Sequence, residues 1–404
     1  MLVIHHGPRG PITGRRVAIT GVGVLAGAGI GDAFFEGLCQ PQPTGHRLVP
    51  EFDPLQWMTA KEAHRADRFT QLATAAAAMA LSDGGAPNAL GLTVDPARAG
   101  VVIGTGIGGV NTLESQMTVA REHGPRRVSP VLVPKMMANA AAASLSIRYG
   151  WLGPCETPVT ACAAGSHAIG SAGLLVASGR CDVVLAGAAE APITPIALAG
   201  FRNMTAMSDS GISRPFDARR DGFVIGEGAA VLLLEDWDHA IARGATILAE
   251  LAGAANTADG YHLTAPAPDG AGAVACMELA LADAALEPTD VAHVNAHGTS
   301  TPLNDRVEAE AITKVFGTPG PPVTSIKGVT GHSFGAAGAI EAVSAVLSIQ
   351  HRLIPPTAGF EVFDPSIAID VVHGAPRAWE PGPIVSNSFA FGGHNGCLVI
   401  LPPN

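Results

Sequence analysis

The sequence has little charge, few aromatic residues and almost no lysine. Charged residues make up 15% of its 404 positions, and aromatic residues make up 5%. The formal net charge is -11, whereas binding to nucleic acid phosphates needs an extended basic surface. The composition therefore excludes nucleic acid as the main partner and leaves room only for a local basic patch.

Long apolar runs and a secretion signal are also missing. No run reaches the roughly 18 apolar residues of a membrane-spanning helix. The N-terminal stretch MLVIHHGPRGPITGRR has neither the apolar core nor the cleavage site of a signal peptide. The six cysteines are therefore interpreted as reduced thiols rather than as a disulfide framework. We expect a cytoplasmic protein without a membrane partner.

The chain is expected to be an α/β protein that is globular throughout. It is 47% hydrophobic and exceeds the usual size of a single hydrophobic core. Apolar runs alternate with helical runs, which is typical of an α/β protein with buried strands. Strands are predicted over residues 16–25, 99–109, 156–161 and 181–190, and helices over residues 65–85 and 162–178.

The pattern of strands and helices restarts near Ala245. We therefore predict an N-terminal extension, an N-terminal half and a C-terminal half, over residues 1–15, 16–245 and 246–404. Residues 321–350 repeat the order of strand, glycine-containing loop and helix that surrounds VTACAAGSHAIGSA in the first half. Two related halves would bring two helix N-termini together, and such ends offer unpaired N–H groups and a partial positive charge.

Cys162 follows a β-type run and begins a helix rich in alanine and glycine. The partial charge at a helix N-terminus lowers the pKa of a thiol and so favours attack on an acyl group. A buried structural cysteine is the more common alternative for any single cysteine, and we assign that role to Cys39, Cys155, Cys181, Cys276 and Cys397.

Three further motifs favour the catalytic interpretation of Cys162. VNAHGTSTPLND sets His297 where a strand meets a loop, and SIKGVTGHSFGAAG sets Lys327 and His332 before the second helix. SNSFAFGGHNG follows a strand near the C-terminus and has an aromatic residue beside two glycines. Each motif alone is weak evidence, so the argument depends on their combination.

In this order, with SRPFDARRDGFVIGEGAAVL after VTACAAG, the motifs resemble those of the β-ketoacyl-acyl carrier protein synthases, most closely the type II elongation enzymes. The resemblance runs from about Arg16 to Leu401. It implies the thiolase fold, in which two fused, pseudo-repeated halves form a five-layered αβαβα core. It also implies decarboxylative condensation of a malonyl unit with a cysteine-bound acyl chain, as in fatty acid or polyketide elongation.

The resemblance implies roles for the residues of these motifs. Cys162 would take the acyl chain from the phosphopantetheine of an acyl carrier protein, and no other cofactor is expected. His297 and His332 would stabilise the enolate that decarboxylation leaves, since neutral imidazole N–H groups can donate to its oxygen. The backbone N–H groups of Cys162 and Phe391 would form the oxyanion hole, and Phe391 would also be the gate between the acyl and malonyl pockets.

Other positions that match the family lie around this centre. Lys327 and Glu341 resemble a supporting pair that holds the histidines. Thr299 and Thr301 match the pair that binds the pantetheine arm, and Ile107 and Phe201 match residues that line the acyl pocket. Five basic residues would meet the acidic carrier protein: Lys61, Arg65, Arg68, Arg126 and Arg127.

The sequence departs from the family at two positions. Thr205 stands where an arginine is often found, so the expected basic patch has one positive charge fewer. Ala390 replaces the glycine that is usual before Phe391, and a Cβ atom there limits the backbone freedom of the gate.

Several alternative interpretations fit the sequence less well. A thiolase would need a second reactive cysteine, and Cys397 lies beyond the GGHNG loop. A non-catalytic chain-length factor of a polyketide system typically lacks the cysteine found at Cys162. His293 and His297 have no cysteine or carboxylate partners at metal-ligand spacing, so no metal is expected. The glycines at 104, 106 and 109 imitate a dinucleotide fingerprint without its acidic residue. The pathway stays open, as does the choice between a homodimer and a heterodimer with a chain-length factor-like subunit.

Overall fold

The protein is described by a computed structural model that covers residues 14–403, so most of the predicted extension 1–15 lies outside the described residues. The N-terminal half contributes a run of five strands that lie side by side in the order β4 (Cys155–Glu156), β3 (Ala99–Gly104), β5 (Val183–Glu190), β6 (Gly228–Asp236) and β1 (Val17–Ala26). Strands β3 and β5 are parallel, whereas β5, β6 and β1 are antiparallel neighbours. Strand β2 (Gly29–Ile30) adds a short pairing to β1.

The C-terminal half repeats this order. Its strands are β11 (Asp370–Val371), β9 (Pro322–Thr324), β8 (His293–Asn295), β13 (Ile384–Ala390), β14 (His394–Leu401) and β7 (Ala249–Ala258). Strands β8 and β13 are parallel, and β13, β14 and β7 are antiparallel neighbours. The two runs join where β1 pairs with β7, through Ala18 opposite Glu250 and Ile19 opposite Ala249. Strands β10 (Leu353–Ile354) and β12 (Arg377–Ala378) form a separate pair.

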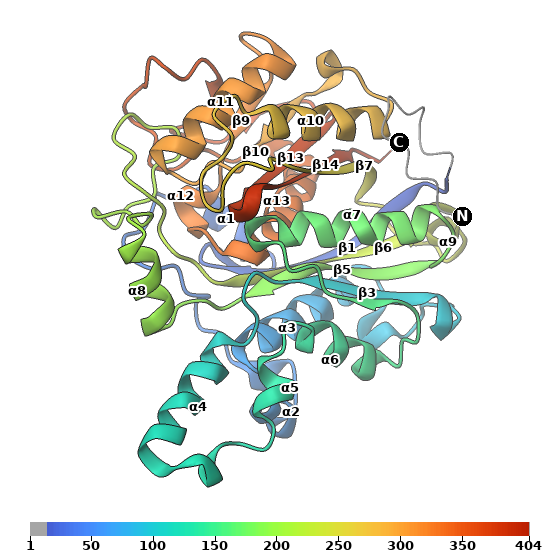
Figure 1. The fold of residues 1–404 in the computed structure, drawn as a ribbon. Helices are drawn as coiled ribbons and strands as arrows, with labels where there is room; N and C mark the ends of the chain where they lie inside the picture. The colour runs from blue at the N-terminus through green and yellow to red at the C-terminus, as the bar shows by residue number, and fades with distance from the viewer. Residues whose placement is uncertain (1–13, 404) are drawn as a thin grey trace.

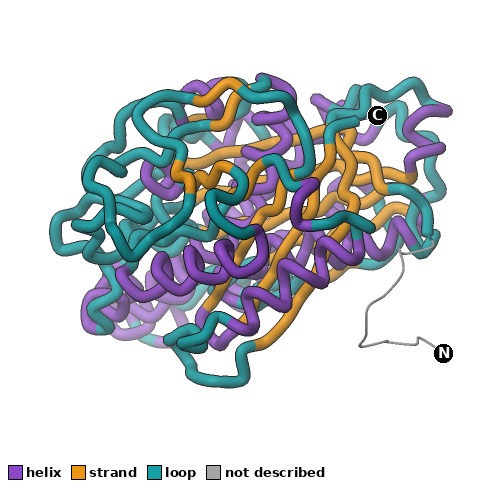
Figure 2. The backbone as a smooth tube through the Cα atoms, turned by 90° about the horizontal axis from the view of Figure 1, so that it is seen from above, coloured by secondary structure: helices purple, strands orange, loops and turns teal. Residues whose placement is uncertain are grey.

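Helices cover both faces of the strands and give five layers (Figure 1). Helices α3 (Arg68–Asp83) and α6 (Ala140–Tyr149) pack on the outer face of the N-terminal strands, and α10 (Ala271–Asp283) packs on the outer face of β7 and β14, with α11 (Pro302–Phe316) against it. Helices α7 (Ala164–Ala177) and α13 (Ala337–His351) pack against each other between the two sets of strands. Seen from above, helices lie in front of the strands (Figure 2). The predicted five-layered α/β arrangement is confirmed.

Helices α7 and α13 form the central layer, and they are rich in small residues because they pack closely against each other. The buried core around α7 and α13 includes the small side chains of Ala168, Ala172, Ala339 and Ala342. A Cβ atom at Gly165 would lie 2.5 Å from the backbone nitrogen of Ala339, so the two helices approach at their N-terminal ends only because glycine stands there. This close approach brings together the two turns that precede the helices.

The remaining helices are α1 (Ala33–Leu38), α2 (Ala60–Arg65), α4 (Val110–His123), α5 (Leu132–Met136), α8 (Pro195–Asn203), α9 (Trp237–Ala242) and α12 (Lys327–Thr330). They range from the four residues of α12 to the 14 residues of α4. The chain passes from α9 to β7 through residues 243–248, where the predicted junction at Ala245 lies. A division into separate units there stays a prediction. Over residues 14–403, every helix is too short or too polar to cross a bilayer.

Three predicted elements differ from the structure, the first being the strand expected over residues 99–109, which ends at Gly104. The helix expected over residues 65–85 begins only at Arg68, because the Asp67 side chain caps α3 there, and Arg65 is the last residue of the separate helix α2. The strand expected over residues 156–161 ends at Glu156. Pro158 supplies no N–H for a strand, and Ala161 has a φ of +50°, so the chain turns instead of continuing extended.

Candidate active site

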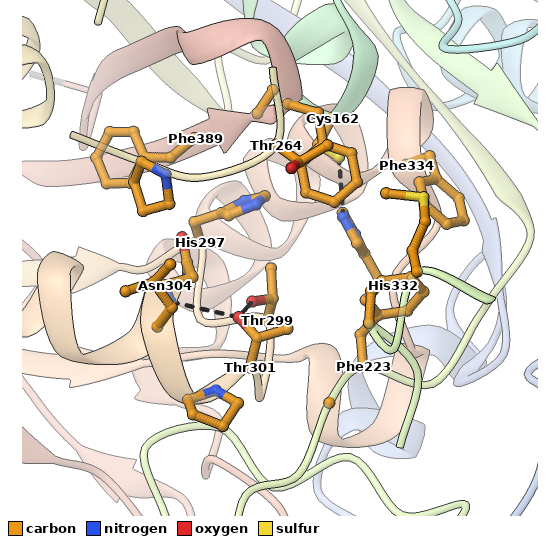
Figure 3. Close-up of a pocket in the computed structure, with 18 of the residues that line it drawn as sticks. Cys162, Phe223, Thr264, His297, Thr299, Thr301, Asn304, His332, Phe334 and Phe389 are labelled. Carbon is orange, nitrogen blue, oxygen red and sulfur yellow. Dashed lines mark hydrogen bonds between the residues drawn. The ribbon is translucent and has the colours of Figure 1, made fainter. Parts of the chain in front are cut away.

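Cys162 lies in a single 3₁₀ turn, η5 (Ala161–Ala163), which leads directly into α7. Its side chain is buried, and its Sγ lies 3.0 Å from Nε2 of His332. Figure 3 shows these two side chains pointing toward one another. The backbone N–H groups of Phe391 and of Cys162 itself also act on the thiol and lower its pKa. The thiol is thus placed at a helix start beside a ring nitrogen and two backbone donors.

The pKa of the Cys162 thiol is nevertheless raised, whereas the sequence predicts that the helix N-terminus lowers it. Burial raises its pKa to about 12, and the charge of Lys327 and the two N–H groups offset this only in part. The predicted position at the helix start is found, but the predicted lowering of the pKa is wrong. Desolvation of a fully buried thiolate outweighs the partial charge of the helix end.

His297 and His332 come from different segments of the C-terminal half and meet at the thiol. His297 follows β8, and His332 follows α12. Their ring centroids lie 5.3 Å apart, with the planes at 84°. Burial lowers the pKa of both rings well below the usual value, and Lys327 lowers both further. Both imidazoles are therefore neutral at physiological pH.

Lys327 fixes the proton on the ring of His297. Its buried Nζ lies 2.5 Å from the carbonyl oxygen of His297 and 3.4 Å from Nδ1 of the same residue, and it is ion-paired with Glu341. An ammonium group has only donors, so Nδ1 of His297 accepts and Nε2 carries the proton. His297 therefore presents an N–H group. Burial raises the pKa of Glu341 to about 7 in spite of its bond to Lys327.

A buried carboxylate holds the loop that carries His297. The backbone N–H groups of His297 and Gly298 each donate to Glu308 of α11, at 2.7 Å. In the same loop the hydroxyl groups of Thr299 and Thr301 lie 2.9 Å apart. Thr301 is also the N-cap of α11. The loop is therefore fixed to the helix that follows it.

A cavity of about 390 Å³ opens onto the thiol and both histidines. The two threonine hydroxyls lie on its wall, as Figure 3 shows. The rest of its wall combines aromatic and polar residues, including Phe223, Thr264, Asn304, Phe334, Phe389, Phe391 and Asn395. The lining of the cavity extends from the polar loop of Thr299 and Thr301 to the buried thiol of Cys162. This arrangement suits an extended ligand with a reactive end.

Two predicted pocket residues are placed differently. Phe201 stacks on Phe334 with ring centroids 4.6 Å apart and so packs behind the wall of the cavity. Ile107 is outside this cavity, and 42% of its surface is exposed. Phe201 therefore packs against the apolar cluster that contains Cys162 and Phe334, whereas Ile107 does not line the cavity.

The predicted basic residues divide into two groups. Lys61 and Arg65 are exposed on α2, and Arg126 and Arg127 are exposed in the turn η4 (Pro125–Arg127) after α4. Arg68 differs.

The guanidinium of Arg68 makes a two-point ion pair with buried Glu227, with bonds of 2.7 and 2.6 Å. A buried carboxylate would lose its charged partner if Arg68 turned outward. Arg68 is therefore held in place by Glu227, with 34% of its side chain exposed, and its part in the carrier-protein surface stays a prediction.

Sequence reasoning missed the buried acids that support the site, Glu190 and Glu308. Glu308 lies in a helix where an acidic residue normally faces solvent, and Glu190 ends a strand that is otherwise apolar. An acidic residue at the end of an apolar strand, as at Glu190, is the sequence signal that points to such a group.

The ligand atoms of Cys162, His297 and His332 lie within 4.8 Å of one another, a separation compatible with a metal ion within the described part of the chain. The proton on Nε2 of His297 leaves that nitrogen without a lone pair, and Lys327 adds a positive charge beside it. This arrangement disfavours a metal. His293, the other histidine considered, packs against Trp379 with ring centroids 5.8 Å apart. That the protein holds no metal stays a prediction.

Comparison with known proteins defines the class of this one. The N-terminal domain of the β-ketoacyl synthases matches residues 43–240, and the C-terminal domain of the same enzymes matches residues 248–361. Solved ketosynthases superpose on the chain over nearly its whole length. The protein is an acyltransferase-type condensing enzyme with a thiolase-like fold.

More particularly, the chain belongs to the β-ketoacyl synthase family. It is 45% identical to 3-oxoacyl-[acyl-carrier-protein] synthase 2 of Synechocystis, over 87% of this chain and 85% of that protein. It is 40% identical to the protein of the same name from Vibrio harveyi, over 95% and 98%. A β-ketoacyl synthase from Burkholderia phymatum matches with a TM-score of 0.89 at 33% identity, over 96% and 100% of the two chains.

Ketosynthases of another kind are also similar in structure. The ishigamide ketosynthase/chain length factor matches with a TM-score of 0.90 at 32% identity, over 97% of this chain and 100% of that chain. The fold is thus shared with both groups of enzymes.

Proposed function

We propose that this protein extends an acyl chain by decarboxylative condensation with malonyl-acyl carrier protein, with Cys162 as the point of attachment of the chain. The substrates are carried on the phosphopantetheine of acyl carrier protein, as in its relatives named 3-oxoacyl-[acyl-carrier-protein] synthase 2. The observation that carries the proposal is the 3.0 Å approach of Cys162 Sγ to His332 Nε2, with the N–H group of His297 beside them.

The first step moves the acyl chain to the enzyme. The sulfur of Cys162 attacks the carbonyl carbon of the acyl thioester, and Nε2 of His332 takes the thiol proton. The carbon–sulfur bond to the phosphopantetheine breaks, and the leaving thiolate takes that proton. Because Cys162 and His332 are both neutral beforehand, the proton moves during the attack rather than before it.

The second step forms the carbon nucleophile. The bond between the malonyl methylene carbon and its carboxylate breaks, CO₂ leaves, and the electron pair forms an enolate on the thioester. The enolate oxygen accepts a hydrogen bond from Nε2–H of His297, and a second one from Nε2 of His332 after the ring proton of His332 has moved from Nδ1 to that nitrogen. Two neutral donors in a buried site stabilise this oxygen more strongly than water does.

The third step joins the two carbon chains. The methylene carbon attacks the carbonyl carbon of the acyl-Cys162 thioester, and the resulting oxyanion accepts from the backbone N–H groups of Cys162 and Phe391. Collapse of this intermediate expels the sulfur of Cys162 as a thiolate, which takes up a proton from solvent. In this scheme Thr299 and Thr301 bind the pantetheine arm, and Phe391 separates the acyl and malonyl pockets.

Fatty acid elongation is the pathway that sequence identity favours, since the relatives at 40 to 45% identity carry the name 3-oxoacyl-[acyl-carrier-protein] synthase 2. The second candidate is the ketosynthase of a type II polyketide system, paired with a chain-length factor. Its support is structural similarity to ketosynthases that work with such a partner. A homodimer active without a second subunit would favour the first pathway.

We also propose a cytoplasmic location. All six cysteines are free thiols, and an uncombined Cys162 thiol is required by the chemistry. Reduced thiols are the rule in the cytosol. Fractionation of cells that express the tagged protein tests this, and recovery in an oxidising compartment would contradict it.

The central experiment labels the nucleophile. The purified protein is incubated with an acyl-acyl carrier protein thioester, and its peptides are analysed by mass spectrometry. The acyl adduct is expected on Cys162 and not on Cys155, which is the exposed free thiol and hence the matched control. Addition of malonyl-acyl carrier protein should then release a product two carbons longer.

Variants complete the test. Cys162→Ala should abolish condensation, whereas Cys155→Ser should leave it unchanged. An adduct on another cysteine, or condensation by Cys162→Ala, would show that the assignment is wrong. Product mass with and without an added chain-length factor distinguishes the two pathways.

A further inference from the structure

Glu190, the last residue of β5, is fully buried and collects hydrogen bonds from both halves of the molecule. Its Oε2 accepts from the backbone N–H of Gly106 at 2.5 Å and from that of Gly335 at 3.1 Å. Its Oε1 accepts from the hydroxyl of Thr105 at 3.1 Å and from the backbone N–H of Ile107 at 3.3 Å. The loop after β3 and the turn before α13 therefore meet at one carboxylate.

The backbone packs directly on this carboxylate. A Cβ atom at Gly335 would lie 2.1 Å from the nitrogen of Gly106 and 2.7 Å from Oε2 of Glu190. A Cβ atom at Gly106 would lie 2.7 Å from the same oxygen. No side chain fits between the two segments, so their N–H groups depend on Glu190 for a partner. Buried donors left without an acceptor are costly.

A short series of contacts leads from Glu190 to the reacting groups. Gly335 follows Phe334 in the turn η7 (Phe334–Ala336), and Phe334 has a φ of +44°, which is unfavourable for a bulky residue. The ring of Phe334 lies 4.8 Å from the ring of His332. His332 in turn contacts Cys162. A strained residue thus packs on the catalytic histidine and is held from its other side by the bond to Glu190.

The turn η7 is the counterpart of the turn that carries the nucleophile. Residues 161–165 read ACAAG and residues 334–338 read FGAAG, and the first residue of each has a positive φ. Gly335 therefore stands at the position that corresponds to Cys162. In the C-terminal half the carboxylate of Glu190 lies where a side chain at position 335 would begin.

We propose that Glu190 is a positioning residue for the condensation: its carboxylate ties the turn of Phe334 to the loop after β3 and so holds His332 at its distance from Cys162. This inference rests on the proposed function, because it gives Glu190 a part in that reaction. The charge of Glu190 has a second effect. Burial is the main cause of the raised pKa of Cys162, and Glu190 raises it further.

Glu190→Gln tests the proposal, because glutamine keeps the size of the side chain but has a single acceptor oxygen for the donors around it. We expect kcat for condensation, per titrated Cys162, to fall by about 10- to 100-fold, as small displacements of catalytic groups do. KM for the acyl carrier substrate should change little. The pH profile of Cys162 alkylation by iodoacetamide should shift to lower pH, because a negative charge near the thiol is removed.

Glu235→Gln is the matched control. Glu235 is also fully buried and lies on β6, at the opposite end of the β5–β6 pair from Glu190. It accepts from Arg243 and His239 rather than from the loops of the site. Its variant should lower Tm without a change in kcat per titrated Cys162 or in the alkylation profile.

Thr105→Val keeps the proposal testable if Glu190→Gln does not fold. It removes one of the hydrogen bonds to Glu190 and should lower kcat in the same direction by a smaller factor. Where both fold, the double variant should lose less than the product of the two single effects, since both act through one carboxylate.

Wild-type kcat in Glu190→Gln, or in Thr105→Val if only that variant folds, would overturn the proposal. Equal losses in Glu190→Gln and Glu235→Gln with no shift of the alkylation profile would also overturn it. Failure of the wild-type protein to condense in the same assay would contradict the proposed function instead.

Discussion

Cys162 and His332 are both uncharged in the free enzyme, because burial acts on a thiol and on an imidazole in opposite directions. It raises the pKa of Cys162 to about 12 and lowers that of His332 well below its usual value. The pair therefore avoids an ion pair that would have to be desolvated in the buried site. Reactivity arises only when an acyl group reaches the sulfur and the two N–H donors at the thiol can hold the oxyanion.

The two histidines should be separable from the thiol by their partial reactions. His297→Ala and His332→Ala each remove a donor to the enolate oxygen, and we expect malonyl decarboxylation to fall by about 10²-fold or more. Acylation of Cys162 should fall little in His297→Ala, since His297 does not contact the sulfur, and more in His332→Ala, which also loses the group that takes the thiol proton. Release of labelled CO₂ from malonyl-acyl carrier protein measures the first step, and normal release by both variants would contradict these roles.

Cys162→Gln is the complementary variant. Its side chain places a neutral amide where the acyl thioester would be, and the histidines stay in place. Decarboxylation of malonyl-acyl carrier protein is expected to continue in the absence of condensation. A variant that loses decarboxylation along with condensation would mean that the thiol itself takes part in that step.

Ala390 is unstrained in this structure, since its φ of -121° and ψ of 157° are those of extended backbone. The loop leaves this conformation if Phe391 swings aside, and a Cβ atom then restricts the backbone where glycine would not. We expect Ala390→Gly to speed acyl transfer to Cys162 by about two- to fivefold, the equivalent of the usual difference in backbone freedom. The gain should be largest for long chains.

Single-turnover acylation with a short and a long acyl carrier substrate measures this effect. Malonyl decarboxylation serves as the control, because it should change little. Identical rates and chain-length dependence in the two proteins would mean that Ala390 has no role in gating.

At the scale of elements, α2 and η4 present the exposed cations of the predicted docking surface (Figure 1 shows α2 near α4 and α5). The partner is an acidic carrier protein, and this chain has a net charge of -11. Local attraction must therefore exceed the overall repulsion, and binding should weaken as salt screens it.

Charge reversal tests this surface. Arg65→Glu and Arg127→Glu should raise KM for the acyl carrier substrate about tenfold, by the loss of a favourable charge contact and the gain of an unfavourable one. Reaction with a free pantetheine thioester should change little. Arg180→Glu is the matched control, an exposed arginine just after the C-terminal end of α7 and therefore at the far end of that helix from Cys162. Equal effects on both substrates would point to another docking face.

The sequence predicts the elements and residues that depend on local pattern and fails where distant contacts decide. The buried strands at 17–26 and 183–190 and the helix after Cys162 follow from apolar runs and small residues. The ion pair of Arg68 with Glu227 joins positions far apart in the chain, and no local pattern indicates it. The pKa of Cys162 depends on complete burial, which the helix-end argument alone does not include.

The site could be predicted because its groups follow strand ends in recognisable motifs. His297, Lys327 and His332 meet at Cys162 as expected. Ile107 could not be placed, because its surroundings depend on how its loop packs rather than on its residue type. Glu190 was missed for the same reason, since the value of a buried acid lies in the backbone groups that surround it.

At the scale of the whole molecule, buried carboxyl groups oppose folding at alkaline pH. Burial raises the pKa of Glu190, Glu308 and Glu341 from 4.5 to about 7. A carboxyl group whose pKa is raised on folding stabilises the protein fully below its unfolded pKa. That contribution is lost as pH rises through the folded pKa, here toward pH 7.

Buried histidines oppose folding at acidic pH. Burial lowers the pKa of His293 to about 3 and lowers those of His297 and His332 well below 6.5. Their contribution is present above pH 6.5 and is lost as pH falls below that value, because the unfolded chain then binds protons that the folded chain does not. The two sets of groups nearly offset each other between pH 4.5 and 6.5.

We therefore expect Tm to be highest in mildly acidic buffer and to fall by a few degrees toward pH 8. Differential scanning calorimetry at constant ionic strength measures this profile. Glu308→Gln should flatten the alkaline side, because one of the carboxyl groups no longer ionises, although the loss of its bond to His297 lowers Tm throughout. A Tm that rises steadily from pH 5 to pH 8 would contradict the prediction.

The position of β1 has a consequence for how the chain is made. This apolar strand, Val17–Ala26, is synthesised well before its partners, Gly228–Asp236 and Ala249–Ala258. At about 5 to 20 residues per second, synthesis leaves β1 unpaired for some 10 to 40 seconds. An exposed apolar strand is prone to pair with other chains during that interval. Yield in rapid expression should therefore depend on chaperones that shield nascent segments, more than on the stability of the finished protein.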